Sequence, residues 1–287
     1  MSARTSTVRT QILTRATLVA VALVVGATAP ATVRAQTVFS ASGADAAAIL
    51  GQVTAFRTAL GTPNPNVAGS AASGRREINW DGVPVQFQTP NNQPPDFFNV
   101  NSPRGVVTTT PGSGVQVSAN DPARFGNLNP TYATQFTTFS PPRLFTSIGS
   151  NIVDVAFFVP GSTVPAFTSA FGVVFVDVDL ANTTSLQFFD MSGGSLGSFS
   201  AAAASSGLSF LGVQFAAGTQ VGRVRITSGN TAIGPTENGN TDVVVMDDFI
   251  YAEPQAVVPE PSTWLLLATG LGIVGLVQRR RLYRRTT

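Results

Sequence analysis

Residues 151–159 read Asn-Ile-Val-Asp-Val-Ala-Phe-Phe-Val, and Pro160-Gly161 follows at once. Apolar side chains alternate with others along this stretch, which is the two-residue period of a β-strand, and Pro-Gly is a turn signal. Six further short apolar segments follow, separated by turns: 171–179, 185–190, 195–200, 208–215, 221–227 and 242–251. Since no amphipathic helix lies between them, we expect an all-β, antiparallel two-sheet sandwich.

A jelly roll similar to that of carbohydrate-binding modules is the expected topology. Upstream of the strands, residues 44–60 have apolar side chains at helical intervals: Ile49, Val53, Phe56 and Leu60. Ser42 is a candidate N-cap, and Gly61 lies just past the last apolar position. The pattern predicts one N-terminal amphipathic helix that packs against the sheet.

Residues 62–142 are rich in Pro, Asn, Gly and Ser, with short apolar fragments at 83–85, 105–108 and 115–117. Phenylalanines recur through the segment, which favours short edge strands and long loops over a disordered linker. Trp80 lies beside Asp81 and shortly after Arg75, Arg76 and Glu77. An indole among charged hydrogen-bonding groups indicates a sugar site with Trp80 as the ligand residue. A semi-buried core tryptophan is the commoner alternative.

Two pairs of aspartates are candidate metal ligands. Asp177 and Asp179 are two residues apart, so on a strand they point to the same face, whereas Asp247 and Asp248 project to opposite faces. One of the second pair could join Asp179 or Asp242 around calcium, while the other caps a turn. The alternative is that all are solvated carboxylates at strand ends.

The chain contains no Cys and no His. This composition excludes disulfides, thiolate nucleophiles, Cys zinc sites and the Ser-His-Asp mechanism, and it leaves calcium as the one metal to consider. We expect no other cofactor and no enzymatic activity. The alternative is a carboxylate-based glycoside or polysaccharide-cleaving enzyme, which needs two opposed carboxyl groups in a cleft.

The N-terminus has the pattern of a cleaved leader. Three arginines precede an apolar stretch from Ala16 to about Ala29, and Val33-Arg34-Ala35 supplies small residues ahead of Gln36. We therefore interpret residues 1–35 as a signal peptide that signal peptidase cuts between Ala35 and Gln36. A simple N-terminal anchor is the alternative.

The C-terminus combines three features in a fixed order. Pro259-Glu260-Pro261 is followed by an apolar run at 264–277 and by the cluster Arg279-Arg280-Arg281. This order resembles the PEP-CTERM sorting signal of Gram-negative bacteria, which implies processing by an exosortase and transient insertion of a short transmembrane helix into the inner membrane. At fourteen residues by the numbering, the run is shorter than the ~17 to 25 of a comfortable permanent span.

Three regions follow: the signal peptide, an exported domain at 36–256 and a sorting tail at 257–287. Eight arginines against fourteen Asp and Glu give the body a formal charge of −6, which argues against nucleic acid as a partner.

The strand segments of the body resemble those of exported PEP-CTERM β-sandwich proteins of unknown function. We expect a structural or adhesive protein of the cell surface or extracellular matrix, in contact with exopolysaccharide or biofilm.

Overall fold

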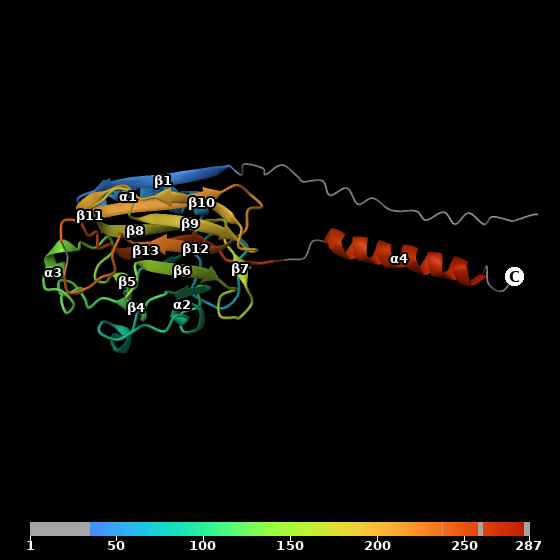
Figure 1. The fold of residues 1–287 in the computed structure, drawn as a ribbon, viewed down its shortest axis with the longest axis horizontal. Helices are drawn as coiled ribbons and strands as arrows, with labels where there is room; N and C mark the ends of the chain where they lie inside the picture. The colour runs from blue at the N-terminus through green and yellow to red at the C-terminus, as the bar shows by residue number, and fades with distance from the viewer. Residues whose placement is uncertain (1–34, 237, 258–260, 284–287) are drawn as a thin grey trace, which may run out of the picture. The chain divides into compact units, whose positions relative to one another are not determined.

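The computed structural model describes residues 35–236, 238–257 and 261–283, and its body is built on two β-sheets (Figure 1). Sheet A has seven strands, with β2 (Arg75–Ile78) paired to β13 and the others in this order: β1 (Gln36–Gly43), β11 (Ala204–Phe215), β8 (Ala170–Val178), β13 (Val245–Ala252), β5 (Phe145–Ile148) and β4 (Gly114–Val117). Sheet B has five: β10 (Ser195–Ser200), β9 (Ser185–Asp190), β12 (Val221–Thr227), β6 (Ile152–Phe157) and β3 (Val106–Thr109).

All pairings between these strands are antiparallel in the part of the chain that the structure describes. A further short pair joins β7 (Ala166–Phe167) to β14 (Gln255–Ala256). The chain crosses between the sheets repeatedly, from β11 in sheet A to β12 in sheet B and back to β13. This crossing is typical of a jelly roll, but sheet A alone has seven strands, and a jelly roll has about eight in all. The predicted antiparallel, mostly β body is confirmed, and its two sheets are consistent with a sandwich.

Two apolar cores hold the body together. One lies between the sheets and includes Phe171, Phe175 and Phe249 of sheet A with Phe188 and Val224 of sheet B. The other covers the opposite face of sheet A, where helix α1 (Ala46–Leu60) and the segment around α3 (Tyr132–Gln135) pack. Sheet A is therefore buried on both faces, between sheet B and a layer of helix and loop.

Helix α1 buries the four apolar residues that its sequence pattern indicated, Ile49, Val53, Phe56 and Leu60. It begins later than predicted: Asp45, not Ser42, is the N-cap, because Oδ1 of Asp45 accepts a hydrogen bond from the backbone N of Ala48 at 3.0 Å. Ser42 lies instead in strand β1, which pairs with β11. The predicted sheet contact of the helix is confirmed.

Two glycines of sheet A allow this helix to pack closely against the sheet. Gly172 of β8 and Gly212 of β11 are directly paired, and a Cβ atom on either would lie 2.9 to 3.1 Å from the ring of Phe56. The absence of side chains at this one place lets the aromatic ring approach the sheet backbone. The ring also contacts Phe39 and Phe210 at centroid distances of 5.2 and 5.6 Å.

The segment 62–142 is ordered, with short strands and loops as predicted. The fragments at 105–108 and 115–117 correspond to β3 and β4, which are the edge strands of sheets B and A. The fragment at 83–85 is not a strand, since η1 (Val85–Phe87) is a short 3-10 helix, and α2 (Phe97–Val100) is a single turn.

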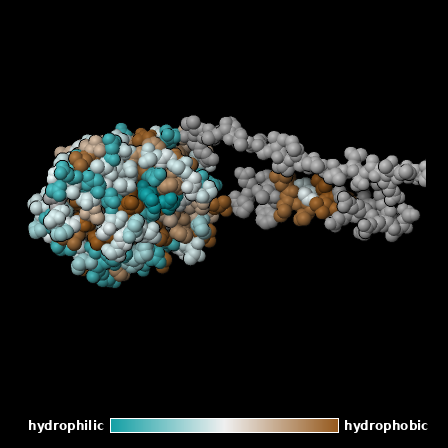
Figure 2. Space-filling model, in the orientation of Figure 1, coloured by the Kyte–Doolittle hydropathy of each residue, from teal (hydrophilic) through white to brown (hydrophobic). Residues whose placement is uncertain are grey.

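The remaining predictions concern the two ends of the chain, the signal peptide and the sorting tail. Residues 1–34 lie outside the described residues, and β1 begins at Gln36, the predicted first residue of the mature chain. Helix α4 (Pro261–Tyr283) begins at the last proline of the Pro-Glu-Pro segment, and Pro259 and Glu260 lie outside the described residues. Most of its described side chains, which include Leu266, Leu271 and Ile273, are apolar and exposed (Figure 2). Among the described residues, no helix has the length and apolarity needed to span a membrane.

Candidate functional site

A polar groove with a volume of about 560 Å³ opens beside β2. Its lining comes from the end of α1, the loop before β2, β2 itself, β13 and three further loops, at residues 79, 104 and 140. We call it the polar groove, and it is lined by Arg57, Pro63, Asn64, Asn66, Arg75, Glu77, Asn79, Arg104, Ser140 and Asp248. Nine of these ten residues are polar, so the groove is built to exchange hydrogen bonds.

An ion-pair network forms the floor of the polar groove. Arg57 Nη2 lies 2.6 Å from Glu77 Oε2 and 3.0 Å from Asp248 Oδ2, so one guanidinium bridges two carboxyl groups. Arg75 Nε also contacts Glu77, at 2.6 Å. Burial opposes the charge on Glu77, but the hydrogen bonds from Arg57 and Arg75 outweigh it and hold the pKa of Glu77 below its usual value.

Asp248 and its neighbour Asp247 form a buried carboxyl pair. Ser140 Oγ lies 3.0 Å from Asp247 Oδ1 and also contacts Asp248 Oδ1, and the backbone N atoms of Phe139 and Ser140 donate to Asp247 Oδ2. The prediction that the two side chains project to opposite faces is wrong, because an irregularity in strand register falls between Met246 and Phe249. Such a bulge lets adjacent side chains reach the same group.

Both members of this pair titrate abnormally. Burial and then the charge of Asp248 raise the pKa of Asp247 well above its usual value. Burial also raises the pKa of Asp248, against the hydrogen bonds from Ser140 and Asp247 and the charge of Arg57. Both carboxyl groups contact the hydroxyl of Ser140, and a single proton held by the pair avoids two adjacent buried charges.

A second ion pair lies fully inside the wall of the groove. Arg76 Nε donates to Glu253 Oε2 at 2.7 Å, and both side chains are 1% exposed. The same guanidinium donates to the carbonyl oxygens of Pro65, Gly69 and Pro103. Arg76 therefore fixes the loops that shape the groove, and it is not available to a ligand.

Trp80, predicted as a sugar-binding residue, is a core residue. It is 1% exposed, stacks on Phe145 at a centroid distance of 3.9 Å, and meets Phe98 and Phe249 edge to face. Its indole N–H donates to the backbone oxygen of Asp247 at 2.7 Å. Because both faces of the indole are covered, a sugar ring cannot stack on it. Trp80 is therefore the core tryptophan that the sequence analysis gave as the alternative. The charged neighbours behave differently, since Arg75 and Glu77 do line the groove.

The predicted calcium ligands are not brought together. Asp177 is buried with φ at +66°, and its carboxylate accepts from Gln135 Nε2 at 2.7 Å and from the backbone N of Ser206 at 2.6 Å. Asp242 accepts from the backbone N of Asp179 and caps the following turn. Within the described residues, no three acidic side chains cluster closely enough to hold a metal ion.

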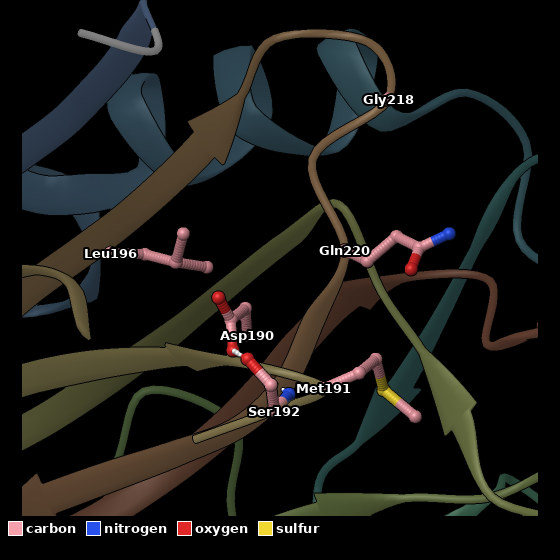
Figure 3. Close-up of a pocket in the computed structure, with 6 residues that line it drawn as sticks. All are labelled: Asp190, Met191, Ser192, Leu196, Gly218 and Gln220. Atoms are coloured by element: carbon pink, nitrogen blue, oxygen red, sulfur yellow. Dashed lines mark hydrogen bonds between the residues drawn. The ribbon is translucent and has the colours of Figure 1, made fainter. Parts of the chain in front are cut away.

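A smaller hollow of about 310 Å³ lies at the turn between β9 and β10 (Figure 3). It is lined by Asp190, Met191, Ser192, Leu196, Gly218 and Gln220. The carboxylate of Asp190 accepts from Ser192 Oγ at 2.6 Å and from the backbone N atoms of Ser192 and Gly194 at 2.8 Å. The Ser192 hydroxyl above all, with these backbone donors, lowers the pKa of Asp190. The Asp190 carboxylate is therefore occupied by hydrogen bonds that close the turn. The polar groove is the stronger candidate for a functional site.

Sequence reasoning missed seven of the ten residues that line the polar groove: Arg57, Pro63, Asn64, Asn66, Asn79, Arg104 and Ser140. Arg57 follows the buried Phe56 in the last turn of α1, a place where a basic side chain commonly faces solvent. Arg104 and Ser140 come from loops whose spatial neighbours no local pattern reveals. Only the charge of Arg57 beside the helix C-terminus gave any signal.

Comparison with known proteins identifies the tail alone. Residues 257–281 match the PEP-CTERM protein-sorting motif. No curated protein and no solved structure matches the chain. These comparisons therefore transfer no site to the body, whereas the match to the tail confirms the resemblance to exosortase substrates. The chain carries a PEP-CTERM sorting motif, which marks it as an exported protein that an exosortase sorts at a membrane.

Proposed function

We propose that the body is a structural or adhesive module of the cell surface or extracellular matrix, which contacts exopolysaccharide through the polar groove. The observation that carries the proposal is the sorting motif at 257–281, joined to a β-sandwich with an open polar groove. In this proposal signal peptidase removes residues 1–35, and the apolar part of α4 is held transiently in the inner membrane while exosortase acts at Pro259-Glu260-Pro261.

The lining of the groove supports a sugar as its ligand. Arginine, asparagine and carboxylate side chains present fixed donors and acceptors, which match the hydroxyl groups of a saccharide. The ion pairs of Arg57, Arg75 and Glu77 hold these groups in place before a ligand arrives. Such preorganisation reduces the entropy cost of binding.

One observation favours a polysaccharide-cleaving enzyme as the second candidate. Glu77 and Asp248 approach the same guanidinium nitrogen, and their pKa values are shifted in opposite directions. Two neighbouring carboxyl groups whose pKa values are shifted in opposite directions are the usual acid and base of a glycosidase. Asp248 is only 3% exposed, however, and Arg57 occupies the space between the two, which favours binding without cleavage.

One experiment distinguishes the two candidates. The full chain, purified in detergent with and without millimolar calcium, is applied to a glycan array, and release of reducing sugar is measured on every glycan that binds. We expect binding without release. Release that is lost in both Glu77→Gln and Asp248→Asn would establish the enzyme, and no binding to any glycan would refute the groove as a saccharide site.

A further inference from the structure

Arg104 is the one arginine of the polar groove for which no carboxylate partner is found among the described residues. Arg57 and Arg75 both pair with Glu77. The Arg104 guanidinium contacts the hydroxyl of Ser102 through Nη1 and lies over the ring of Phe98 at 5.0 Å, while its Nε is buried without any hydrogen-bond partner. A buried guanidinium N–H left unpaired is costly, so the site favours an added acceptor nearby.

The surroundings of Arg104 do not compensate its charge. Burial lowers the pKa of Arg104, and the neighbouring Arg76 lowers it further, while the phenol of Tyr251 is the group that raises it. The single acid close to Arg76, Glu253, is already paired to it at 2.7 Å. An anion placed in the groove next to Arg104 would therefore meet a positive charge that no side chain neutralises.

The charge balance of the groove differs from that of the body. Three arginines and two acids line the groove, whereas the body carries a formal charge of −6. The net charge of the body repels a negatively charged chain, and the arginines of this groove attract it. The two acids of the groove make a dianionic phosphate a poorer occupant than a monoanion, and the planar guanidinium fork matches a carboxylate.

We propose that the polar groove selects an acidic polysaccharide, with a uronate carboxylate bound by Arg104 and the sugar hydroxyl groups bound by asparagines. Asn66 and Asn79 line the same groove and are exposed, and Asn79 is held by a 2.6 Å hydrogen bond from its Nδ2 to Asp81 Oδ2. The inference rests on the proposed saccharide function and adds the class of sugar to it.

The test compares two forms of one polymer. Binding of the full chain in detergent is measured with polygalacturonate and with its fully methyl-esterified form, which has the same backbone and no charge. We expect the acidic form to bind at least tenfold more tightly, and we expect the difference to shrink as salt rises from 50 to 500 mM, since the contact is ionic. Equal binding of both forms would overturn the inference and leave the saccharide function standing. Binding of neither form would also overturn the inference, and the saccharide function would then depend on the glycan array alone.

Variants locate the contact. Arg104→Gln should lose about tenfold or more in affinity for polygalacturonate, because the hydrogen bond between two charged groups is removed, while binding of the esterified form stays unchanged. Arg124→Gln is the matched control, since Arg124 pairs with Asp121 outside the groove. A loss of the same size in both variants would show a general charge effect and refute the assignment of Arg104. Arg104→Lys should recover part of the affinity, which separates lost charge from lost structure.

Discussion

Sheets A and B differ in how many of their faces meet solvent, and the difference decides where charges can lie. Strand β8 of sheet A is buried at all nine positions, whereas β6 of sheet B alternates buried and half-buried residues. The reason is the layer of α1 and α3 on the outer face of sheet A, which sheet B lacks. A doubly covered sheet must neutralise its polar groups internally, while a singly covered sheet can leave them to water.

The two sheets hold comparable ion pairs under these different conditions. On sheet A, Arg76 and Glu253 are each 1% exposed. On sheet B, Asp154 pairs across strands with Arg223 and Arg225, whose side chains are 33% and 39% exposed. Both sites pair arginine with a carboxylate, but they differ in exposure to solvent. Comparing them therefore measures how burial changes the contribution of a salt bridge within one molecule.

The largest effect is expected from Arg76→Met. The substitution leaves the Glu253 carboxylate buried without its partner and frees three loop carbonyls, so the free energy of unfolding should fall by about 3 to 5 kcal/mol. Urea denaturation followed by tryptophan fluorescence measures it, because Trp80 lies in the adjoining core. The double variant Arg76→Met with Glu253→Gln should recover part of the loss. A loss below 1 kcal/mol would show that water reaches this pair.

A smaller loss is expected where α1 meets sheet A. Gly212→Val places a side chain against the ring of Phe56, so overpacking should cost about 1 to 3 kcal/mol of unfolding free energy. Gly51→Ala is the matched control, because an added Cβ at Gly51 meets no atom within 4 Å and removes flexibility from a helix, which should stabilise by roughly 0.5 to 1 kcal/mol. If the two changes altered the unfolding free energy equally, helix α1 would not be closely packed against the sheet at Gly212.

A dependence on pH should arise from the carboxyl groups near sheet A. Burial and then the charge of Asp248 raise the pKa of Asp81 to about 6, against an unfolded value of ~3.9. A raised folded pKa gives stability that is complete below the unfolded pKa and is lost as pH rises through about 6. Asp81→Asn should therefore weaken the fall in melting temperature between pH 5 and pH 7. Asp96→Asn, at an exposed position, should leave that fall unchanged.

The sequence predicted the strands from 151 onward well, because alternation and turns are local signals. Each of the seven segments corresponds to one strand, namely β6 and β8 to β13, and the two-residue strand β7 was not predicted. Strand β1 was missed, since its Ser and Ala residues look like a helix cap, and β2 and β5 are four residues long. Which strands share a sheet could not be predicted, because that depends on contacts between residues far apart in the chain.

Site prediction failed where a side chain's surroundings decide its role. Trp80 and Arg76 belong to one charged segment that suggested a sugar site, yet both are buried, whereas Arg75, Glu77 and Asn79 of the same segment line the groove. The bulge that brings Asp247 and Asp248 to the same serine has no signature in a run of apolar and acidic residues. The tail was predictable because its signal is a linear motif that needs no fold.

The smallest effect is expected on sheet B, from Asp154→Asn. Burial opposes the charge of Asp154, but hydrogen bonds from Arg225 and Arg223 prevail and lower its pKa, so its contribution is present at neutral pH and is lost as pH falls through that lowered pKa. Water screens both arginines, and we therefore expect a loss of only about 0.2 to 1 kcal/mol at pH 7, shrinking further in 1 M salt. Parallel denaturation of Arg76→Met and Asp154→Asn measures the comparison directly. If the two losses were equal, the covering layer of α1 and α3 would have no electrostatic consequence, and the contrast between the sheets would be one of packing alone.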